Sequence, residues 1–392
     1  SGRTLAWGIL MGVRPTKIAM RKLEEGMTQE TFVPWFQKEN LVSEEKAHLA
    51  WQIAGREKKL LDQLDYENGY SLYVGIPFCP TVCSYCSFSS GALGDWEHRV
   101  EDYLAALMKE LEAIAKMSEG RKADTIYMGG GTPTTLNADQ LDRLLTCIDR
   151  HFVREGLLEF TVEAGRPDSI TKEKLQVLRN HGINRISINP QTMKEETLRL
   201  IGRQHTVQQT IDSFKLAREV GFDNINMDLI VGLPEESIAD VRETMRQLEE
   251  LDPDNITVHS LAIKRAARLR MQKEQYENLH IENTAQTIDL TAECCHEMGL
   301  EPYYLYRQKN MAGNFENVGY AKPGKAGVYN ILIMEEKQTI MALGAGATTK
   351  VVFEDGKRIE RVGNVKDIIN YLDRVDEMVE RKRELLKNCG QL

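Results

Sequence analysis

The chain has 392 residues, of which 42% are hydrophobic and 28% charged, a composition typical of folded globular domains rather than disordered chains. At about 150 residues per domain, this length predicts two or three domains and excludes a small disulfide-stapled scaffold. The 50 basic and 59 acidic residues give a formal net charge of -9, which argues against general attraction to nucleic-acid phosphates.

The first 65 residues show no strand pattern and predict a helical segment, residues 1–65, that caps the rest of the protein. Its longest apolar run, residues 5–13, is far shorter than the ~20 residues of a membrane-spanning helix. No small-residue cleavage pattern of a secretory signal follows this run. We therefore expect a cytoplasmic protein without a membrane span. Because the chain begins with Ser1-Gly2 and not Met, we also expect residues to precede it in the natural protein.

Short apolar runs then alternate with amphipathic helices, a pattern typical of repeated βα units and a parallel sheet. The candidate strands are residues 71–76, 125–128, 160–163, 184–188, 225–230 and 256–261. Six units are fewer than the eight strands, in about 250 residues, of a closed barrel. The sequence therefore predicts an α/β fold whose centre, residues 66–270, is a partial (β/α)6 TIM-like barrel.

After residue 270 this alternation stops. The pattern predicts a helix over 282–298, β-like runs at 328–334 and 339–343, a hairpin turn at 354–357 and a final helix from Ile368 to Val379. We expect residues 271–392 to form a small C-terminal α+β domain.

Three of the seven cysteines, Cys79, Cys83 and Cys86, follow the first predicted strand with Cys-x3-Cys-x2-Cys spacing. In a barrel this position is the C-terminal face, where active sites lie. A structural zinc site needs four protein ligands, and His98 and Cys147 are not at a usual spacing. A closed four-cysteine cluster fails on the same count. The triplet favours a 4Fe-4S cluster with one open iron over the alternatives, buried free thiols or a disulfide, because the loop is polar and the expected compartment reducing.

This loop resembles that of the radical S-adenosylmethionine (SAM) superfamily, in which an aromatic residue, here Tyr85, precedes the last cysteine. The resemblance implies that the amino and carboxylate groups of SAM chelate the open iron. It also implies that one electron from the cluster cleaves the sulfonium and releases a 5′-deoxyadenosyl radical.

A second motif, Gly129-Gly130-Gly131-Thr132, follows the second predicted strand. A glycine triplet alone is a weak signal, because many strand-to-helix turns use one and no P-loop lysine follows. At the exposed end of a strand, however, glycines let the backbone approach a ligand closely. The resemblance implies that this motif holds the amino-acid end of SAM.

Single polar residues stand at or beyond the ends of later predicted strands: Glu163, Gln191, Arg203 and Asp228. Each alone is more often a salt-bridge or capping residue than a ligand. Because their strands point them at one face, we expect them to share a pocket. There Glu163 and Asp228 suit ribose hydroxyls or an ammonium group, and Arg203 suits a carboxylate.

The motifs from Tyr73 to Ala262 resemble the oxygen-independent coproporphyrinogen III oxidase family, also called coproporphyrinogen dehydrogenases, and in particular its HemZ-type branch. Residues 12–17 and 317–325 share this resemblance. It implies that one or two SAM molecules contact Tyr73, Tyr85, Gly130, Gly131, Thr132, Glu163, Gln191, Arg203, Asp228 and Ala262. Thr348 is a further candidate. The chain departs from the best-characterised oxidases at Gly75, where they carry histidine, and at Phe88, where they carry a further cysteine.

The resemblance implies a tetrapyrrole substrate and a low-potential electron donor such as flavodoxin or ferredoxin. Two propionates of coproporphyrinogen III would each lose a hydrogen atom, carbon dioxide and an electron, which gives the vinyl groups of protoporphyrinogen IX in haem biosynthesis. The four cations of residues 264–270 could bind such propionates or could begin a solvated helix. No catalytic acid or base is assigned. His259, Tyr303, Tyr304 and Cys294-Cys295-His296 are expected to be packing residues.

Two alternatives from the same family stay open. A sister branch is a haem-binding chaperone, although its His-Asn type of haem motif is not evident here. A third group of radical SAM enzymes degrades haem in anaerobes. A tRNA-modifying enzyme is less favoured, because such proteins usually carry an added basic domain.

Overall fold

The computed structural model describes residues 5–10, 14–66, 68–86, 90–152, 155–262, 279–307, 315–353 and 356–390. Its centre is one 11-stranded sheet with the strand order β13-β12-β11-β1-β4-β5-β6-β7-β8-β10-β9. Six consecutive strands of this sheet pair in parallel and in chain order. They are β1 (Gly69–Ile76), β4 (Lys122–Gly130), β5 (Glu159–Glu163), β6 (Arg185–Ser187), β7 (Ile225–Val231) and β8 (Asn255–Ser260). The predicted six-unit partial barrel is therefore confirmed.

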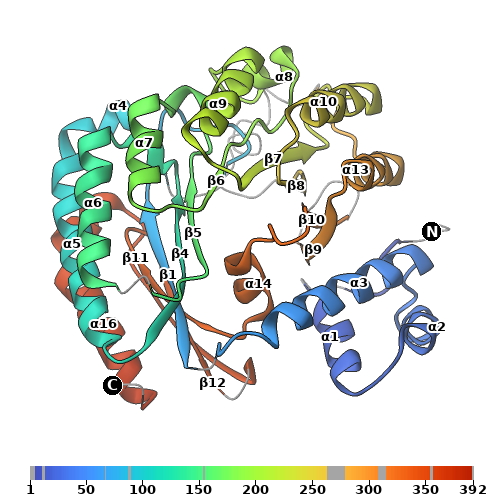
Figure 1. Ribbon diagram of the computed structural model, residues 1–392, viewed down its shortest axis with the longest axis horizontal. Helices are drawn as coiled ribbons and strands as arrows, with labels where there is room; N and C mark the ends of the chain where they lie inside the picture. Colours follow the sequence, from blue (N-terminus) through green and yellow to red (C-terminus); the bar gives the residue numbers. More distant parts are fainter. Residues whose placement is uncertain are drawn as a thin grey trace.

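The helices between these strands cover the convex face of the curved sheet (Figure 1). Their apolar residues recur on one side, as in the first of them, where Leu104, Leu107 and Leu111 are buried. The helices are α5 (Val100–Met117), α6 (Ala138–His151), α7 (Lys172–Asn180), α9 (Val207–Val220) and α10 (Ile238–Leu251). Shorter elements in the connections are β2 (Phe78–Cys79), β3 (Gly91–Ala92), α4 (Leu93–Trp96), η1 (Glu97–Arg99), η2 (Pro133–Thr135), η3 (Pro167–Ser169) and α8 (Glu195–Leu200).

The N-terminal region is helical, as its sequence predicts, with α1 (Thr16–Glu24), α2 (Gln29–Asn40) and α3 (Glu44–Leu61). α3 packs against the strand β9 (Glu301–Tyr306) at one edge of the sheet. Arg56 fixes this contact, because its Nη1 donates to the carbonyl of Pro302 at 2.8 Å and its Nη2 lies 2.9 Å from Glu301. None of the described helices is long and apolar enough to cross a membrane.

The C-terminal region supplies strands to both edges of the same sheet. β11 (Thr339–Leu343) pairs in parallel with β1, and the hairpin of β12 (Thr348–Phe353) and β13 (Arg358–Gly363) continues outward from it. At the other edge, β10 (Asn317–Ala321) pairs antiparallel with β8 and β9. The region also contains α13 (Ala285–Glu297), α15 (Ile368–Asp373) and α16 (Val375–Asn388). The strand at 339–343, the hairpin and the helix α13 were thus predicted. The single final helix predicted from Ile368 to Val379 is instead divided into α15 and α16 at Arg374, and β9 and β10 were not predicted.

The β-like run predicted at 328–334 is wrong, because this segment forms the helix α14 (Val328–Glu335). Its residues are apolar almost without interruption, and periodicity cannot separate a buried strand from a buried helix in so short a run. The helix lies on the concave side of the sheet (Figure 1). There the ring of Tyr329 stacks on Tyr127 of β4, with ring centroids 4.5 Å apart. α14 therefore forms part of the barrel interior.

Candidate functional site

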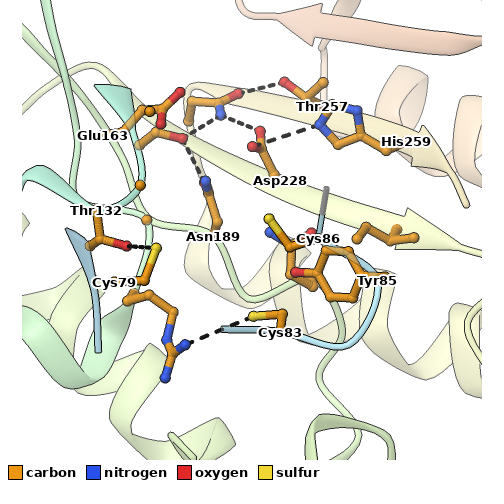
Figure 2. A pocket seen from close by; sticks show the side chains of 18 of the residues that line it. Cys79, Cys83, Tyr85, Cys86, Thr132, Glu163, Asn189, Asp228, Thr257 and His259 are labelled. Atoms are coloured by element: carbon orange, nitrogen blue, oxygen red, sulfur yellow. Dashed lines mark hydrogen bonds and ion pairs between the residues drawn. The ribbon is translucent and has the colours of Figure 1, made fainter. Parts of the chain in front are cut away.

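A cavity lies at the carboxyl ends of the barrel strands, where a parallel barrel is expected to hold its site. Twelve of the predicted site residues line it, as Figure 2 shows for several of them. They are Cys79, Cys83, Tyr85, Cys86, Gly130, Gly131, Thr132, Glu163, Gln191, Arg203, Asp228 and Ala262. The basic group at 264–270 and Phe88 lie outside the described residues.

The cysteine loop and the glycine motif hold each other by backbone hydrogen bonds. The amide of Gly131 donates to the carbonyl of Ile76, and the amide of Thr132 donates to that of Phe78, both at 2.7 Å. A Cβ at position 131 would lie 2.5 Å from the oxygen of Phe78, so only glycine permits this approach. The glycine motif thus shapes the cysteine loop as well as the cavity wall.

The three cysteine thiols face one space and are free of disulfides (Figure 2). The hydroxyl of Thr132 donates to the sulfur of Cys79 at 3.6 Å, and the guanidinium of Arg166 donates to that of Cys83 at 3.8 Å. Burial nevertheless raises the pKa of the Cys79 thiol, so a bound cation would be needed to hold it as a thiolate.

The other described cysteines do not line the cavity. They lie on α6, on α13 and after α16, at Cys147, Cys294, Cys295 and Cys389. Within the described residues the cavity therefore offers three sulfur ligands and no fourth. This set of donors fits a 4Fe-4S cluster that leaves one iron open to another ligand, and it does not fit a closed four-cysteine cluster.

The cavity brings together two carboxyl groups with different electrostatics. Burial raises the pKa of Glu163 to about 7, although the hydroxyl of Tyr127 donates to it. Burial also opposes ionisation of Asp228, but the nearby imidazole of His259 and a hydrogen bond from Asn226 lower its pKa below the ordinary value. Asp228 is therefore an anion near neutral pH, while Glu163 is divided between its charged and neutral forms.

A row of polar side chains across three strands orients Asp228. The amide nitrogen of Asn226 donates to Asp228 at 2.7 Å and to the hydroxyl of Ser187 at 2.8 Å. The hydroxyl of Thr257 donates to the amide oxygen of Asn226 at 3.0 Å. Sequence reasoning missed this row. Its signal was the recurrence of polar residues two positions apart within apolar strands, since alternate residues face one side.

His259 lines the cavity, so the expectation that it is only a packing residue is wrong. Its Nε2 lies 3.7 Å from the carboxylate of Asp228, and its Nδ1 lies 3.3 Å from the hydroxyl of Tyr306. Tyr304 is buried and also lines the cavity, whereas Tyr303 and Cys295 are buried without lining it. His259 of β8 and Tyr304 and Tyr306 of β9 thus form one wall of the cavity.

Gln191 and Arg203 border the cavity through unusual local structure. Gln191 has a φ of 67°, a left-handed conformation that costs a non-glycine residue about 1–3 kcal/mol. Hydrogen bonds on both sides of its peptide, to Asp228 and from Ile230, hold it there. Arg203 is 6% exposed and donates from Nη1 to the carbonyl of Asn189. Its buried Nε has no partner among the described residues.

Tyr73 lies elsewhere, in a second cavity that it lines with Gly75, Gly130, Thr348 and Lys350. Gly130 lines both cavities. The ring of Tyr73 stacks on that of Tyr127, with centroids 6.3 Å apart. The two cavities are therefore neighbours on either side of β4, and the thirteen predicted residues divide between them.

Comparisons with known proteins agree with this geometry. Residues 73–248 match the model of the radical SAM superfamily. The chain is 42% identical over 391 residues to the oxygen-independent coproporphyrinogen-III oxidase-like protein HemZ of Bacillus subtilis. This alignment covers 99% of the chain and 78% of HemZ. It is 33% identical over 311 residues to the heme chaperone HemW of Bacillus subtilis, with 78% of this chain and 76% of HemW covered.

Among solved structures, the coproporphyrinogen III oxidase HemN of Escherichia coli, a radical SAM enzyme, has a similar fold. The match has a TM-score of 0.64 and 25% sequence identity, and it covers 82% of this chain and 73% of HemN. The identity to HemZ extends over nearly the whole chain, beyond the barrel itself. The chain therefore belongs to the radical SAM superfamily and, within it, to the family of the oxygen-independent coproporphyrinogen III oxidases and their HemZ-type relatives.

Proposed function

We propose that the protein is a radical SAM enzyme that converts two propionates of coproporphyrinogen III into vinyl groups, which yields protoporphyrinogen IX. The observation that carries this proposal is the cavity itself. It combines three cysteines that lack a fourth with a polar and aromatic interior that extends well beyond them, in a chain 42% identical to a protein described as coproporphyrinogen-III oxidase-like.

The residues of the cavity divide by chemistry into a cluster site and a SAM site. Cys79, Cys83 and Cys86 would hold the 4Fe-4S cluster. The buried guanidinium of Arg203 suits the carboxylate of SAM, and the carboxylate of Asp228 suits the ribose hydroxyls. When bound and reduced, cluster and SAM supply a carbon-centred radical that takes one hydrogen atom from the substrate.

The chain's own residues must hold the substrate and keep water from it. Each propionate, -CH2-CH2-COO⁻, becomes -CH=CH2 when it loses one hydrogen atom, one CO2 and one electron. The electron passes to an external one-electron acceptor. The tyrosines that line the cavity, Tyr127, Tyr304 and Tyr306, supply a largely apolar wall for the pyrrole rings.

The second cavity is the place that we assign to a second SAM molecule. Tyr73 and Thr348 line it, and Gly130 joins it to the first. A protein loaded with cluster should then bind two molecules of SAM in equilibrium dialysis. Thr348→Trp, which fills the second cavity, should reduce this number to one. If the unaltered protein binds only one molecule of SAM, the proposal of a second SAM site is wrong.

The proposal is tested by assembling the cluster without oxygen and adding SAM, a strong reductant and coproporphyrinogen III. The expected result is the joint appearance of 5′-deoxyadenosine and of the vinyl product, with flavodoxin or ferredoxin able to replace the chemical reductant. If the cluster is intact and neither product forms, the proposed reaction is wrong.

A second candidate is a haem-binding chaperone, and the 33% identity to HemW favours it over other non-enzymatic functions. The same protein sample decides between the two. Stoichiometric binding of haem without formation of either product would support the chaperone, whereas product formation without tight haem binding would exclude it.

A further inference from the structure

Arg185 lies at the start of β6 and faces the interior of the barrel. Arg185, Ser187 and Asn189 occupy alternate positions and all line the main cavity, while Ile186 and Ile188 are fully buried on the opposite face. Arg185 pairs in register with Thr161, and Ser187 pairs with Glu163. Arg185 therefore lies one pleat, about 7 Å along the strand, deeper in the barrel than Glu163.

The guanidinium of Arg185 is buried without a matching partner. The residue is 2% exposed, and its Nε and Nη2 have no hydrogen-bond partner in the part of the chain that the structure describes. No carboxylate among the described residues lies within 4.0 Å of it. Arginine keeps its charge in proteins, and a buried charge is costly unless it is paired and hydrogen-bonded. The described residues therefore supply no directly paired counter-ion for this charge, and Glu159, Glu163 and Asp228 act on it only at longer range.

Arg166 gives the contrast within the same cavity. It is also 2% exposed, but its Nε and Nη2 donate to Asp168 at 2.9 and 2.7 Å, and its Nη1 donates to Thr81 at 3.0 Å. Its guanidinium is satisfied by the protein and holds the cysteine loop. Burial alone thus does not prevent pairing in this cavity. Of the three arginines that line it, Arg203 keeps a hydrogen bond from Nη1 and lacks a partner only at Nε, whereas Arg185 lacks a partner at both Nε and Nη2 among the described residues.

The surroundings of Arg185 explain why no described carboxylate forms a direct ion pair with it. The nearest acidic residue on the neighbouring strand, Glu159, accepts one hydrogen bond from the hydroxyl of Thr161 and another from the backbone amide of Val328. Behind the guanidinium, a Cβ on Gly327 would lie only 3.4 Å from its central carbon. The start of α14 therefore closes this side, and Arg185 opens only toward the cavity.

We propose that Arg185 pairs with a propionate carboxylate of the tetrapyrrole that enters this cavity. The identity of the ligand rests on the proposed function. A guanidinium binds a carboxylate with two parallel hydrogen bonds, and the unpartnered Nε and Nη2 are the two donors of such a fork. Tyr127 and Tyr304, which line the cavity with Arg185, suit the pyrrole ring that carries the propionate.

The test is equilibrium binding of coproporphyrinogen III to the cluster-loaded protein, without oxygen and without reductant, so that no turnover occurs. Arg185→Gln should weaken binding about 30-fold or more, as expected for removal of one partner of a buried charge pair. Arg185→Lys keeps the charge but cannot donate two parallel hydrogen bonds, so its affinity for coproporphyrinogen III should lie between those of wild type and Arg185→Gln. The tetramethyl ester of the substrate should bind wild type and Arg185→Gln equally.

The matched control is Arg307→Gln. Arg307 is 5% exposed, donates to the carbonyl of Leu10 and does not line the cavity. This variant should keep wild-type affinity for coproporphyrinogen III, and all variants should keep wild-type affinity for SAM. Equal binding of coproporphyrinogen III by wild type and Arg185→Gln would overturn the proposal, as would a loss confined to SAM.

Thermal unfolding separates an anchor from a structural arginine. Since the charge has no protein partner, Arg185→Gln should unfold at the same temperature as wild type or higher. A lower unfolding temperature, with equal losses of affinity in Arg185→Gln and Arg185→Lys, would indicate a structural role and overturn the proposal. If coproporphyrinogen III binds in a way that depends on Arg185 but no vinyl product forms, the proposed reaction is wrong, whereas the proposed pairing of Arg185 with a propionate still holds.

Discussion

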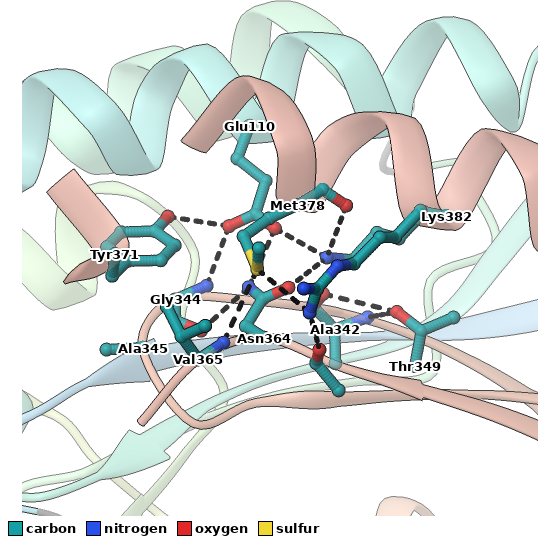
Figure 3. A network of polar contacts seen from close by, with 12 residues as sticks. Glu110, Ala342, Gly344, Ala345, Thr349, Asn364, Val365, Tyr371, Met378 and Lys382 are labelled. Atoms are coloured by element: carbon teal, nitrogen blue, oxygen red, sulfur yellow. Dashed lines mark hydrogen bonds and ion pairs between the residues drawn. The ribbon is translucent and has the colours of Figure 1, made fainter. Parts of the chain in front are cut away.

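Two buried polar regions of this molecule are built in opposite ways. Behind β11, Lys382 and Glu110 are both fully buried, and their charged atoms lie 2.6 Å apart (Figure 3). Every remaining lone pair of Glu110 is met, by the hydroxyl of Tyr371 at 2.6 Å, the amide of Gly344 at 2.9 Å and the side chain of Asn364 at 2.8 Å.

The main cavity has the opposite character. It is lined by the unpartnered guanidinium of Arg185, a carboxyl group with a raised pKa at Glu163 and a strained backbone at Gln191. Polar groups that serve the fold are satisfied within the protein, because an unsatisfied one is costly. We infer that the groups left unsatisfied in this cavity meet a ligand, whereas the groups around Glu110 serve the fold.

The largest effect is expected at the cysteine loop. Cys83→Ala removes one of three ligands, so iron bound after reconstitution should fall from about four atoms per chain to near zero, and all activity should vanish. Cys147→Ala, a cysteine of α6 outside the cavity, should retain wild-type iron and activity. A full cluster in Cys83→Ala would contradict the metal assignment.

Mutations in the buried network around Glu110 and Lys382 should lower the stability of the protein. Lys382→Met leaves Glu110 buried without its cation and should lower the free energy of unfolding by about 3–5 kcal/mol, measured by urea denaturation. Lys172→Met, which breaks an exposed ion pair with Glu219, should leave the unfolding midpoint unchanged. If both variants unfold alike, the network of Figure 3 is not what holds α16 to the sheet.

The contribution of Glu163 to the stability of the protein should depend on pH. Glu163 has a folded-state pKa of about 7 against an ordinary value of 4.5, so the folded protein keeps a proton that the unfolded chain loses. The stability of wild type relative to Glu163→Gln should therefore fall as pH rises from about 4.5 to about 7 and then level off.

Urea denaturation of the cluster-loaded protein, without SAM, at several pH values measures this slope. Glu101→Gln serves as the control, because Glu101 lies on α5 outside the cavity and its pKa is lowered by hydrogen bonds from Gln140 and Arg143, so that its titration lies below that interval. Parallel stability curves for wild type and Glu163→Gln would show that the carboxyl group is not held in its neutral form.

The smallest effect is expected at His259, whose imidazole lies 3.7 Å from the carboxylate of Asp228. His259→Gln should weaken SAM binding about 5-fold, equivalent to about 1 kcal/mol, in equilibrium dialysis. His280→Gln, an exposed histidine outside the cavity, should bind SAM as wild type does. If His259→Gln binds SAM as tightly as wild type does, the proposed contact between Asp228 and SAM is wrong.

The local features of this protein could be predicted from the sequence. The cysteine triplet and the glycine motif each occupy one short segment of the sequence. The six strands are recognisable as short apolar runs between amphipathic helices. For the same reason the cavity could be placed at the ends of those strands. Cys79, Glu163 and Asp228 meet there because parallel strands end at one edge.

Features that depend on distant segments could not be predicted. The sequence around α14 does not reveal its helical state, since a short buried helix and a short buried strand are equally apolar. β10 joins the sheet at β8, so its pairing depends on residues that lie some 60 positions apart, such as Val258 and Val318. Arg185 resembles any charged residue at a strand start until the structure shows that its Nε and Nη2 have no hydrogen-bond partner among the described residues.

The most direct test of the central claim follows one hydrogen atom. Coproporphyrinogen III labelled with deuterium on the propionate carbon next to each pyrrole ring is incubated with the reduced, cluster-loaded protein and SAM, and the 5′-deoxyadenosine is examined by mass spectrometry. If the proposed reaction takes place, 5′-deoxyadenosine carries deuterium and accumulates with the vinyl product. Unlabelled 5′-deoxyadenosine beside unchanged coproporphyrinogen would contradict it.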